Sequence, residues 1–275
     1  MTISVLMSVY KNEQAAYLDR ALQSVWDDQT LKPNQIVLIE DGPLGEELVA
    51  VLDDWKEKLG DVLLLLKNDV NLGLTKSLNK GIARVTSDLI ARMDSDDISA
   101  PDRFRLQHDY FVAHPDVHII GGSLQEFDDK NECLNVRHYP LSPNAARIYI
   151  QKASPLAHPT VMMRRKIFDE GLSYNEKYRT SQDIALWFDA LLAGYKISNV
   201  PQVTIYFRRD GDVFKRRGRE KAWNEFKIYM VGIYKLFGPI TLKYAFPISR
   251  LIFRLMPSSV IKYVYGSKAR KKLLK

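Results

Sequence analysis

The strongest constraint on the fold is a regular alternation of short apolar runs and amphipathic stretches over the first hundred residues. The apolar runs predict strands, and the stretches between them carry apolar residues at helical spacing. Continuous apolar strands that alternate with helices are typical of a parallel sheet covered by helices on both faces. We expect strands at Ile3–Val9, Ile36–Glu40, Val62–Lys67 and Leu89–Met93, and helices at Ala15–Trp26, Glu46–Leu59 and Leu74–Arg84.

The segments that directly follow the predicted strands are polar. In open parallel sheets, ligands bind in the crevice outside the carboxyl ends of the strands. We therefore expect one ligand crevice to which all of these segments contribute. They are Ser8–Glu13, Asp41–Gly42, Asn68–Gly73 and Asp94–Asp97.

Beyond Pro101 the alternation continues with less regular spacing. Ser181 is expected to cap a helix at Ser181–Ala193, and Gly194 is expected to end it, because Ser and Gly are favoured at these two positions. The other expected elements are helices at Pro101–His114 and Ser142–Gln151, a loop at Ser154–Pro159, and strands at Val117–Phe127 and Thr160–Met163.

The C-terminal part of the chain differs in composition from the rest. Residues 215–275 hold 16 Lys/Arg and 2 Asp/Glu, a charge of +14, whereas residues 1–214 hold 24 and 31, a charge of −7. Neither a long Gly/Ser linker nor an internal repeat divides the chain before this point. We predict one domain over residues 1–212, with halves 1–100 and 101–212, and a basic extension over 213–275.

Large apolar residues alternate with the charges of this extension. Its longest uncharged runs, among them Leu236–Leu242 and Leu255–Ile261, have seven residues each, whereas a helix needs about 20 apolar residues to span a bilayer. We therefore expect an amphipathic helical extension that lies on an anionic membrane surface. The alternatives are a solvated helical face and nucleic-acid binding, and the second is disfavoured because no nucleic-acid-binding motif is present.

Cysteine and histidine are scarce. The chain has one cysteine, Cys133, and five histidines, which excludes an internal disulfide framework and a Cys/His metal cluster and fits a reducing compartment. The apolar start Met1–Val9 precedes Lys11 and Glu13, which is the reverse of the order in a signal peptide. We therefore expect a cytoplasmic protein.

Three carboxylates lie within four residues after the fourth apolar run: Asp94, Asp96 and Asp97. Like charges this close repel one another unless a cation or a hydrogen-bond donor shares the site. Hard oxygen ligands at this spacing suit Mg²⁺ or Mn²⁺, and the alternative is a solvated acidic turn. An EF-hand calcium loop is excluded because the segment lacks the required glycine and the closing glutamate.

Other residues at the predicted strand ends also suit a nucleotide. Asp41 either accepts a hydrogen bond from a base or forms a turn before Gly42-Pro43. Tyr10 either stacks on a base or packs as a loop aromatic. Asn71 either contacts a phosphate or sugar at the start of a helix or caps that helix. Each residue by itself is compatible with both interpretations.

Together these segments resemble the family-two glycosyltransferases, over about residues 1–215. The resemblance implies a GT-A fold, an α/β architecture with a mostly parallel central sheet flanked by helices. It also implies a nucleoside-diphosphate sugar donor, an Mn²⁺ or Mg²⁺ ion and inversion at the anomeric carbon. The motifs, in the family's order and at its usual spacing, are Ser8-Val9-Tyr10-Lys11-Asn12-Glu13, Glu40-Asp41-Gly42, Asn71-Leu72-Gly73-Leu74-Thr75-Lys76-Ser77-Leu78-Asn79-Lys80-Gly81 and Arg92-Met93-Asp94-Ser95-Asp96-Asp97.

The resemblance assigns these residues to the donor side of the site. Tyr10 and Asp41 are expected to hold the uracil. Asp94 and Asp96 are the expected metal ligands, and Asp94 is also placed to reach the ribose. The other expected donor contacts are Ser8, Glu13, Asn71, Lys76, Arg92, Asp97 and Arg208.

Two later segments are similar to the family's acceptor motifs. Ala157-His158-Pro159-Thr160-Val161-Met162 resembles its His-Pro segment, and Ser181-Gln182-Asp183-Ile184-Ala185-Leu186-Trp187 resembles its Glu-Asp-x-x-Leu-Trp segment. The resemblance makes Asp183 the general base that deprotonates the acceptor hydroxyl. Gln182 stands where the family usually has Glu. The expected acceptor contacts are His158, Gln182 and Trp187, and Trp187 suits the protein core equally well.

One family motif has no counterpart. Many relatives carry a histidine metal ligand after a Tyr-Arg stretch, whereas this chain reads Tyr206-Phe207-Arg208-Arg209-Asp210-Gly211. Either Asp210 or a water takes the place of that ligand. Asp210 and Glu176 are also the alternatives to Asp183 as the base. Arg208, Arg209 and Lys215–Arg217 either close over the leaving group or begin the membrane-binding patch.

The overall resemblance is to bacterial O-antigen and capsule repeat-unit transferases. It implies transfer of glucose or galactose from a UDP-sugar to an N-acetylhexosamine joined through diphosphate to undecaprenol, commonly as a β1,3 link, by a peripheral protein on the cytoplasmic face of the inner membrane. The alternatives are a UDP-sugar-binding module without turnover and a nucleotidyltransferase. The latter is disfavoured because Ser8–Glu13 contains no glycine. The sequence makes no prediction of oligomeric state.

Overall fold

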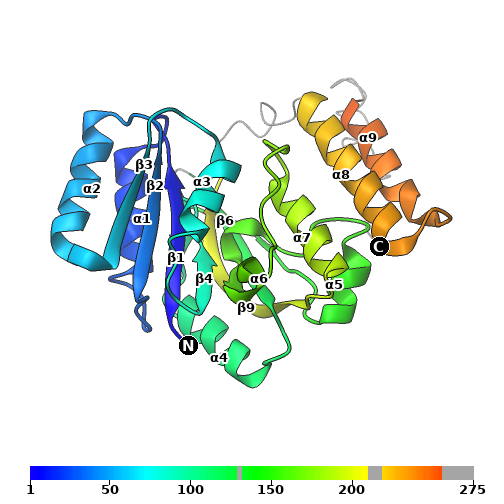
Figure 1. Ribbon diagram of the computed structural model, residues 1–275, viewed down its shortest axis with the longest axis horizontal. Helices are drawn as coiled ribbons and strands as arrows, with labels where there is room; N and C mark the ends of the chain where they lie inside the picture. The colour runs from blue at the N-terminus through cyan, green and yellow to red at the C-terminus, as the bar shows by residue number, and fades with distance from the viewer. Residues whose placement is uncertain (129–131, 210–218, 256–275) are drawn as a thin grey trace.

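A mixed nine-stranded sheet runs through the computed structural model, which describes residues 1–128, 132–209 and 219–255 (Figure 1). The strands are β1 (Ile3–Val9), β2 (Gln35–Asp41), β3 (Leu63–Asn68), β4 (Leu89–Arg92), β5 (Ile98–Ser99), β6 (Ile119–Phe127), β7 (Cys133–Arg137), β8 (Met162–Arg164) and β9 (Ile197–Arg208). Hydrogen-bonded neighbours follow the order β3-β2-β1-β4-β8-β6-β9-β5, and β7 pairs with β6. The predicted GT-A-like α/β fold is confirmed.

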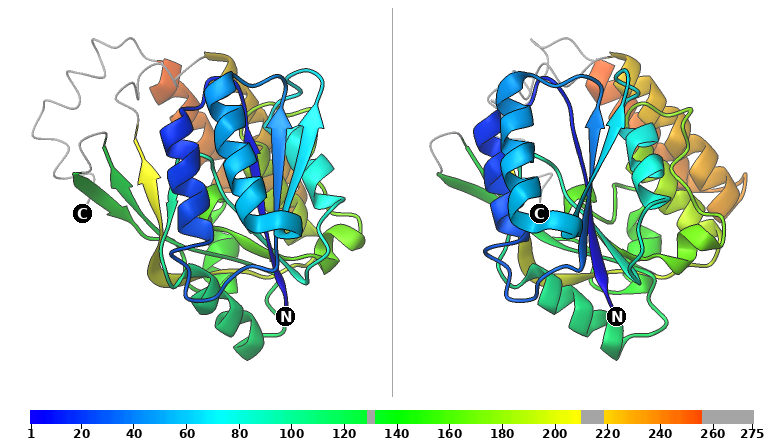
Figure 2. Two further views of the ribbon diagram at one scale, coloured as in Figure 1. Left: turned by 90° about the vertical axis from the view of Figure 1, so that its left-hand side faces the viewer. Right: turned by 60° about the vertical axis from the view of Figure 1, so that its left-hand side comes forward.

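The first half of the sheet is parallel, as predicted, and helices cover both of its faces. β3, β2, β1 and β4 pair in parallel. Because side chains alternate along a strand, Val5 and Met7 of β1 pack with the first two helices, whereas Leu6 packs with the third. Figure 2 shows the two layers. The helices are α1 (Ala15–Val25), α2 (Glu46–Leu59) and α3 (Leu74–Ile82).

The predicted boundaries in this half agree with the structure to within two residues. The close approach of α3 to the sheet depends on Gly81. A Cβ atom at Gly81 would lie 2.4 Å from Cδ1 of Leu6 and 2.6 Å from Cδ1 of Ile39. The glycine thus lets α3 pack directly on β1 and β2, which places the start of α3 at the carboxyl ends of those strands.

The second half of the sheet corrects the expectation of a mostly parallel sheet. β8 is antiparallel to both β4 and β6, and β5 and β7 are also antiparallel to their neighbours. Only β9 pairs in parallel, with β6. Antiparallel neighbours need no crossover helix, and β8 and β5 are too short to give a periodic signal. The helices here are α4 (Arg103–Ala113), α5 (Pro143–Tyr149), α6 (Lys166–Asp169) and α7 (Gln182–Leu192).

The start of α7 also differs from the prediction. Ser181 precedes the helix with φ 60°, in the left-handed region, and its side chain makes no capping hydrogen bond. A capping serine normally has an extended backbone that directs its hydroxyl to the first N–H groups, and the left-handed backbone of Ser181 does not provide this. At the other end Gly194 has φ +84°, which suits the predicted helix stop.

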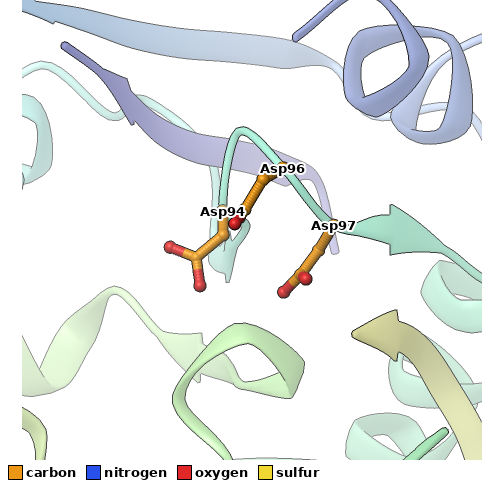
Figure 3. A group of neighbouring side chains, drawn as sticks. All are labelled: Asp94, Asp96 and Asp97. Atoms are coloured by element: carbon orange, nitrogen blue, oxygen red, sulfur yellow. The ribbon is translucent and has the colours of Figure 1, made fainter. Parts of the chain in front are cut away.

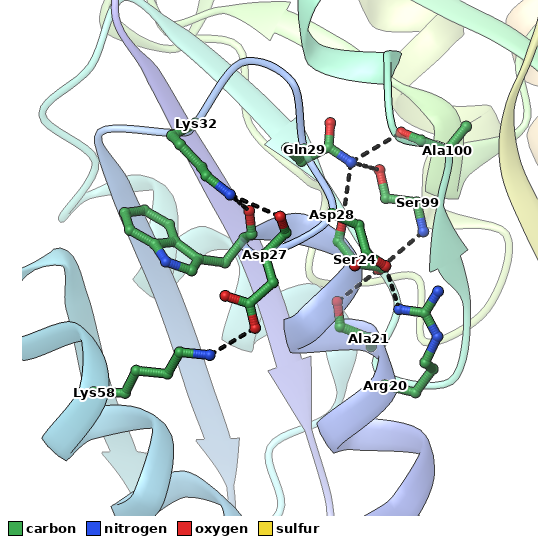
Figure 4. A network of polar contacts seen from close by, with 11 residues as sticks. Arg20, Ala21, Ser24, Asp27, Asp28, Gln29, Lys32, Lys58, Ser99 and Ala100 are labelled. Atoms are coloured by element: carbon green, nitrogen blue, oxygen red, sulfur yellow. Dashed lines mark hydrogen bonds and ion pairs between the residues drawn. The ribbon is translucent and has the colours of Figure 1, made fainter.

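A buried polar network ties the end of α1 to β5 (Figure 4). The Gln29 side-chain amide donates hydrogen bonds to the Ser24 carbonyl oxygen at 2.7 Å and the Ala100 carbonyl oxygen at 2.8 Å. The Ser99 N–H donates to the Ser24 hydroxyl at 3.0 Å. These contacts fix β5, and with it the acidic loop Asp94–Asp97 that leads into this strand.

The described part of the basic extension forms two helices, α8 (Arg219–Phe237) and α9 (Ala245–Leu255). α8 packs on α7, where Tyr229 meets the Phe188 ring edge-to-face at 5.7 Å. A Cβ atom at Gly232 would lie 2.4 Å from that ring. α9 lies against the outer side of α8 (Figure 1). Residues 219–255 therefore pack on the second half of the domain; the predicted boundary at 212/213 lies outside the described residues.

Two short 3₁₀ turns, His158–Thr160 and Leu242–Tyr244, complete the second half, and a third, Gly60–Val62, follows α2. Across the described ranges, no helix is both long enough and apolar enough to cross a bilayer.

Candidate active site

A first cavity of about 570 Å³ lies at the carboxyl ends of β1, β2 and β4. The segments after these strands contribute to it as predicted, and the first turn of α1 and the end of β9 add further residues. Half of the lining residues were predicted as donor contacts or metal ligands. The lining residues are Ser8, Tyr10, Asn12, Glu13, Gln14, Tyr17, Asp41, Asn71, Gly73, Leu74, Asp94, Ser95, Asp96 and Phe207.

Three carboxylates meet on the loop between β4 and β5 (Figure 3). One oxygen each of Asp94, Asp96 and Asp97 lies within 4.8 Å of the others. Burial, and then the charges of Asp94 and Glu13, raise the pKa of Asp96 to about 7. Burial and the neighbouring carboxylates also raise the pKa of Asp97. A bound divalent cation relieves this kind of charge crowding.

The chemistry of these side chains fits a metal. Mg²⁺ and Mn²⁺ prefer carboxylate oxygens, and Oδ2 of Asp97 is buried with no hydrogen-bond partner in the described ranges. Glu13 supports the loop from the segment before α1, because its carboxylate accepts a hydrogen bond from the Ser95 hydroxyl and another from the Gln14 N–H at 2.9 Å.

Arg92 and Asp97 lie behind the cavity wall. Arg92 is almost fully buried and donates two hydrogen bonds to the Asp94 carboxylate. Asp97 is fully buried and accepts a hydrogen bond from the Arg208 N–H at 2.9 Å. Neither residue lines the first cavity. Both residues hold the acidic loop in place, and their predicted role as donor contacts stays a prediction.

Two further predicted donor contacts also lie outside the first cavity. Arg208 is buried, with its guanidinium over the Tyr17 ring at 3.7 Å, and its Nε donates to the Asp96 carbonyl oxygen at 3.1 Å. It thus supports the acidic loop from β9. Lys76 is exposed on α3 and lines neither cavity.

Asp41 has a role that neither sequence interpretation included. Its carboxylate accepts hydrogen bonds from the Leu72 N–H at 2.8 Å, the Gly73 N–H at 2.9 Å and the Asn68 side chain at 3.0 Å. It therefore fixes the loop before α3 and forms no turn of its own. Asp41 still lines the first cavity, so its contact with the base stays a prediction.

The loop that Asp41 holds also excludes one interpretation of Asn71, its role as the cap of α3. Gly73, with φ +87°, is the residue that precedes α3 at the capping position, so Asn71 is not the cap. The Asn71 side chain donates to the Asp41 carbonyl oxygen at 3.1 Å. At the opposite rim Tyr10 is 44% exposed, which leaves its ring free to stack on a ligand.

A second cavity of about 500 Å³ lies where the start of α7 meets α8 and α9. Asp183 lines it from the first turn of α7, and burial raises the pKa of this carboxyl above its usual value. A raised pKa suits a general base, because proton transfer is most effective when the pKa of the base lies near the working pH. The lining residues are Ser154, His158, Arg179, Thr180, Ser181, Gln182, Asp183, Ile184, Lys221, Glu225, Tyr229, Arg250 and Arg254.

His158 and Gln182, two predicted acceptor contacts, are both in this lining. The His158 ring shares a 2.7 Å hydrogen bond with the Tyr174 hydroxyl. Burial, and then the charge of Arg92, lower the pKa of His158 well below its usual value. His158 is therefore neutral at physiological pH and can donate or accept a hydrogen bond.

Trp187 is the predicted acceptor contact that the structure corrects. It is fully buried in the hydrophobic cluster between α7, α8 and the sheet, and it does not line the second cavity. α7 is apolar around most of its surface, so the position one turn after Asp183 points into the core. The core interpretation of Trp187 is the correct one.

The alternative bases are placed differently. Glu176 lies on a separate surface hollow with Asn79 and Tyr174, outside the second cavity. Asp210 and Lys215–Arg217 lie outside the described residues. The sequence interpretation missed the cavity residues of α8 and α9. Their one visible signal was Glu225, an isolated acidic residue within the basic extension.

The fold and the two cavities define a class of protein. A mixed sheet with a carboxylate cluster at the ends of its parallel strands, beside a second cavity lined by Asp183, is the architecture of a GT-A transferase. Residues 4–172 match the family described as Glycosyl transferase family 2. The chain belongs to that family.

Characterised relatives extend over nearly the whole chain. It is 36% identical to the amylovoran biosynthesis glycosyltransferase AmsE of Erwinia amylovora, over 95% of this chain and 97% of the relative. It is 31% identical to the UDP-Gal:alpha-D-GlcNAc-diphosphoundecaprenol beta-1,3-galactosyltransferase of Escherichia coli, over 98% of this chain and 96% of the relative.

Solved structures agree on the fold. The S. aureus TarS fragment 1–349 in complex with UDP-GlcNAc matches with a TM-score of 0.66 at 17% identity, over 92% of this chain and 72% of that chain. The Pyrobaculum calidifontis mannosyltransferase PcManGT, in complex with GDP-Man and Mn²⁺, matches with a TM-score of 0.66 at 15% identity, over 99% and 78%.

Proposed function

We propose that this glycosyltransferase moves a hexose, glucose or galactose, from a UDP-sugar to an N-acetylhexosamine joined through diphosphate to undecaprenol. The product is a β1,3 link in an O-antigen or capsule repeat unit. The observation that carries the proposal is the pair of cavities. One has a carboxylate cluster suited to a metal-bound diphosphate, and the other is lined by Asp183, a half-buried carboxylate suited to an acceptor hydroxyl. The relationship to the E. coli galactosyltransferase supports the choice of acceptor.

The reaction is a single displacement. Asp183 takes the proton of the acceptor hydroxyl while the hydroxyl oxygen attacks the anomeric carbon of the donor and the bond to UDP breaks. Attack from the face opposite UDP inverts the anomeric carbon, so no protein nucleophile is needed. His158 and Gln182 line the same cavity as Asp183 and orient the acceptor sugar by hydrogen bonds.

Tyr10 stacks on the uracil from the rim of the first cavity, and Asp41 contributes through the loop that it holds. Asp94 and Asp96 would hold Mn²⁺ or Mg²⁺, which would neutralise the charge that develops on the departing diphosphate. Arg92 keeps the Asp94 carboxylate oriented.

The protein acts as a peripheral protein on the anionic cytoplasmic face of the bacterial inner membrane. Apolar side chains are exposed on both C-terminal helices and the turn between them, among them Tyr234, Ile240, Leu242, Ile248 and Ile252. Nearby Lys and Arg each add about 1 kcal/mol of attraction to an anionic leaflet. Substituting Ile248→Ser and Ile252→Ser together should release the protein from anionic liposomes without loss of the fold, since both residues are exposed.

The decisive experiment is a release assay. UDP-glucose and UDP-galactose are each incubated with N-acetylglucosamine-diphosphate-undecyl acceptor, with Mn²⁺ and with a chelator. We expect metal-dependent release of UDP together with a disaccharide product. Release of the sugar 1-phosphate instead of UDP would indicate transfer of UMP by a nucleotidyltransferase, and UDP binding without product would indicate a binding module. Equal rates in the chelator would contradict the role of the carboxylate cluster.

A further inference from the structure

The second cavity carries more positive than negative charge. Two carboxylates and four cationic side chains line it, and the cations come from the loop before α7 and from both C-terminal helices. The carboxylates are Asp183 and Glu225, and the cations are Arg179, Lys221, Arg250 and Arg254. Cations this close repel one another, so their arrangement needs a physical reason.

Glu225 accounts for only part of this charge. It is 5% exposed and accepts a hydrogen bond from Arg250 at 2.8 Å and one from Arg254 at 2.5 Å. One carboxylate thus faces two guanidinium groups, and the trio keeps a net positive charge. Each guanidinium has five N–H donors, so most of the donors of Arg254 are not used by Glu225.

The other two cations have no carboxylate partner among the described residues. Across the described ranges, no ion pair joins Arg179 or Lys221 to an acidic side chain. Thr180 also lines the cavity, and its hydroxyl oxygen is buried without a hydrogen-bond partner among the described residues. Unpaired cations and an unpaired hydroxyl in one cavity are groups that an anionic ligand would satisfy.

We infer that this wall, formed by Arg179, Lys221 and Arg254, binds the diphosphate that joins the acceptor sugar to its lipid. The inference rests on the proposed function. An N-acetylhexosamine that presents a hydroxyl to Asp183 carries its diphosphate on the anomeric carbon of the same ring. Asp183 and the cations line one cavity, so a single ligand can reach both.

The same geometry separates the two diphosphates of the reaction. The donor diphosphate belongs to the first cavity, where the carboxylates suit a metal. The acceptor diphosphate meets arginine and lysine directly, because guanidinium groups bind phosphate oxygens in pairs and ammonium groups bind them as point charges. The basic charge of α8 and α9 therefore recognises the substrate as well as attracting the membrane.

Binding of defined probes tests this inference in the full-length protein. The probes are N-acetylglucosamine joined to an undecyl chain through diphosphate, and the same molecule with an uncharged ether link, both in detergent without phospholipid. Arg179→Gln and Lys221→Gln should each weaken binding of the diphosphate probe about tenfold. Both should leave binding of the ether probe and of UDP within twofold. Neither residue pairs with a buried charge, so these variants should fold.

Lys227→Gln is the matched control, because Lys227 is exposed on α8 and lines neither cavity. This variant should bind the diphosphate probe, the ether probe and UDP with unchanged affinity. An equal loss for both probes, or no loss for the diphosphate probe, would overturn the inference. Binding of the same variants to phosphatidylglycerol vesicles is measured in parallel, and a loss confined to the vesicles would also overturn the inference, since the cations would then serve only the membrane.

The binding readout does not depend on turnover. If the wild type binds the diphosphate probe through these residues but transfers no sugar to it, the proposed function fails and the anion site stands. If the wild type transfers sugar and the variants bind the probe normally, the proposed function stands and the anion site fails.

Discussion

The two cavities are built by different parts of the chain. The first cavity takes all but one of its lining residues from the first hundred positions, where strand and helix alternate regularly and each loop follows a predictable strand end. The second cavity combines side chains from Ser154 to Arg254, on the segment Ser154–His158, the loop before α7 and three helices. The comparison teaches that the first cavity follows from the local order of strands and helices, whereas the second cavity depends on how helices distant in the sequence pack together.

The largest expected effect is a loss of turnover, caused by a substitution in the second cavity that leaves the first cavity unchanged. Asp183→Asn should lower kcat by about a hundredfold or more, because it removes the proton acceptor. UDP binding should be unchanged, because Asp183 does not line the first cavity. Steady-state kinetics and UDP titration measure the two quantities. Glu176→Gln serves as the control, and a base outside the second cavity is indicated if Asp183→Asn stays near wild-type turnover.

The converse change acts on the first cavity. Asp96→Ala should weaken UDP binding at least tenfold in the presence of Mn²⁺ and much less in a chelator, because it removes a metal ligand. Asp61→Ala is a suitable control, since Asp61 is exposed in the turn after α2. Titration of UDP with and without Mn²⁺ checks the prediction, and equal weakening under both conditions would argue against metal ligation.

A third change tests the packing on which the second cavity depends. Gly232→Ala places a methyl group against the Phe188 ring, where a Cβ atom would lie 2.4 Å from ring carbon. Overpacking of this kind costs about 1–3 kcal/mol of unfolding free energy. Thermal denaturation should show the loss, with UDP affinity retained. Gly45→Ala, at a position where nothing lies within 4 Å of the added atom, should show none.

Asp41→Asn should have a smaller effect, confined to the first cavity. The two carboxylate oxygens of Asp41 accept hydrogen bonds from the Leu72 and Gly73 N–H groups. In the asparagine variant the amide oxygen can accept one of these hydrogen bonds, but the amide nitrogen cannot accept the other. Loss of one hydrogen bond of this kind corresponds to about 1–2 kcal/mol. UDP affinity should fall several-fold while kcat at saturating donor stays the same. A selective fall in kcat would contradict this account.

The smallest effect is a shift of the pH profile. Burial raises the pKa of Asp183, and the base acts only when it is deprotonated. Turnover at saturating substrates should therefore rise with pH along an acid limb that lies above the usual aspartate pKa of about 3.9. A limb at or below that value would mean that a different group controls turnover.

The sequence predicted what depends on neighbouring residues. The strand Ile3–Val9 and the helix Glu46–Leu59 match the structure at both ends, because apolar periodicity and turn residues act over short distances. The gathering of Tyr10, Asp41 and Asp96 in one cavity also follows from a general property of parallel sheets.

Long-range contacts explain what the sequence did not predict. The three hydrogen bonds of the Asp41 carboxylate reach residues about thirty positions away. The burial of Asp97 depends on Arg208, and the left-handed backbone of Ser181 has no local signature. For Trp187 the sequence is equally compatible with an acceptor contact and with a position in the core. The core position depends on α8, because that helix closes the hydrophobic cluster around Trp187.

The pairing of Glu225 with Arg250 and Arg254 has a consequence for synthesis of the chain. Protein domains generally begin to fold from the N-terminal side during translation. Most of the first cavity can therefore form while the ribosome is still making the second half. The wall around Asp183 stays incomplete until the codon for Arg254 has been read. A chain that ends before this codon would therefore form the first cavity without a complete second cavity.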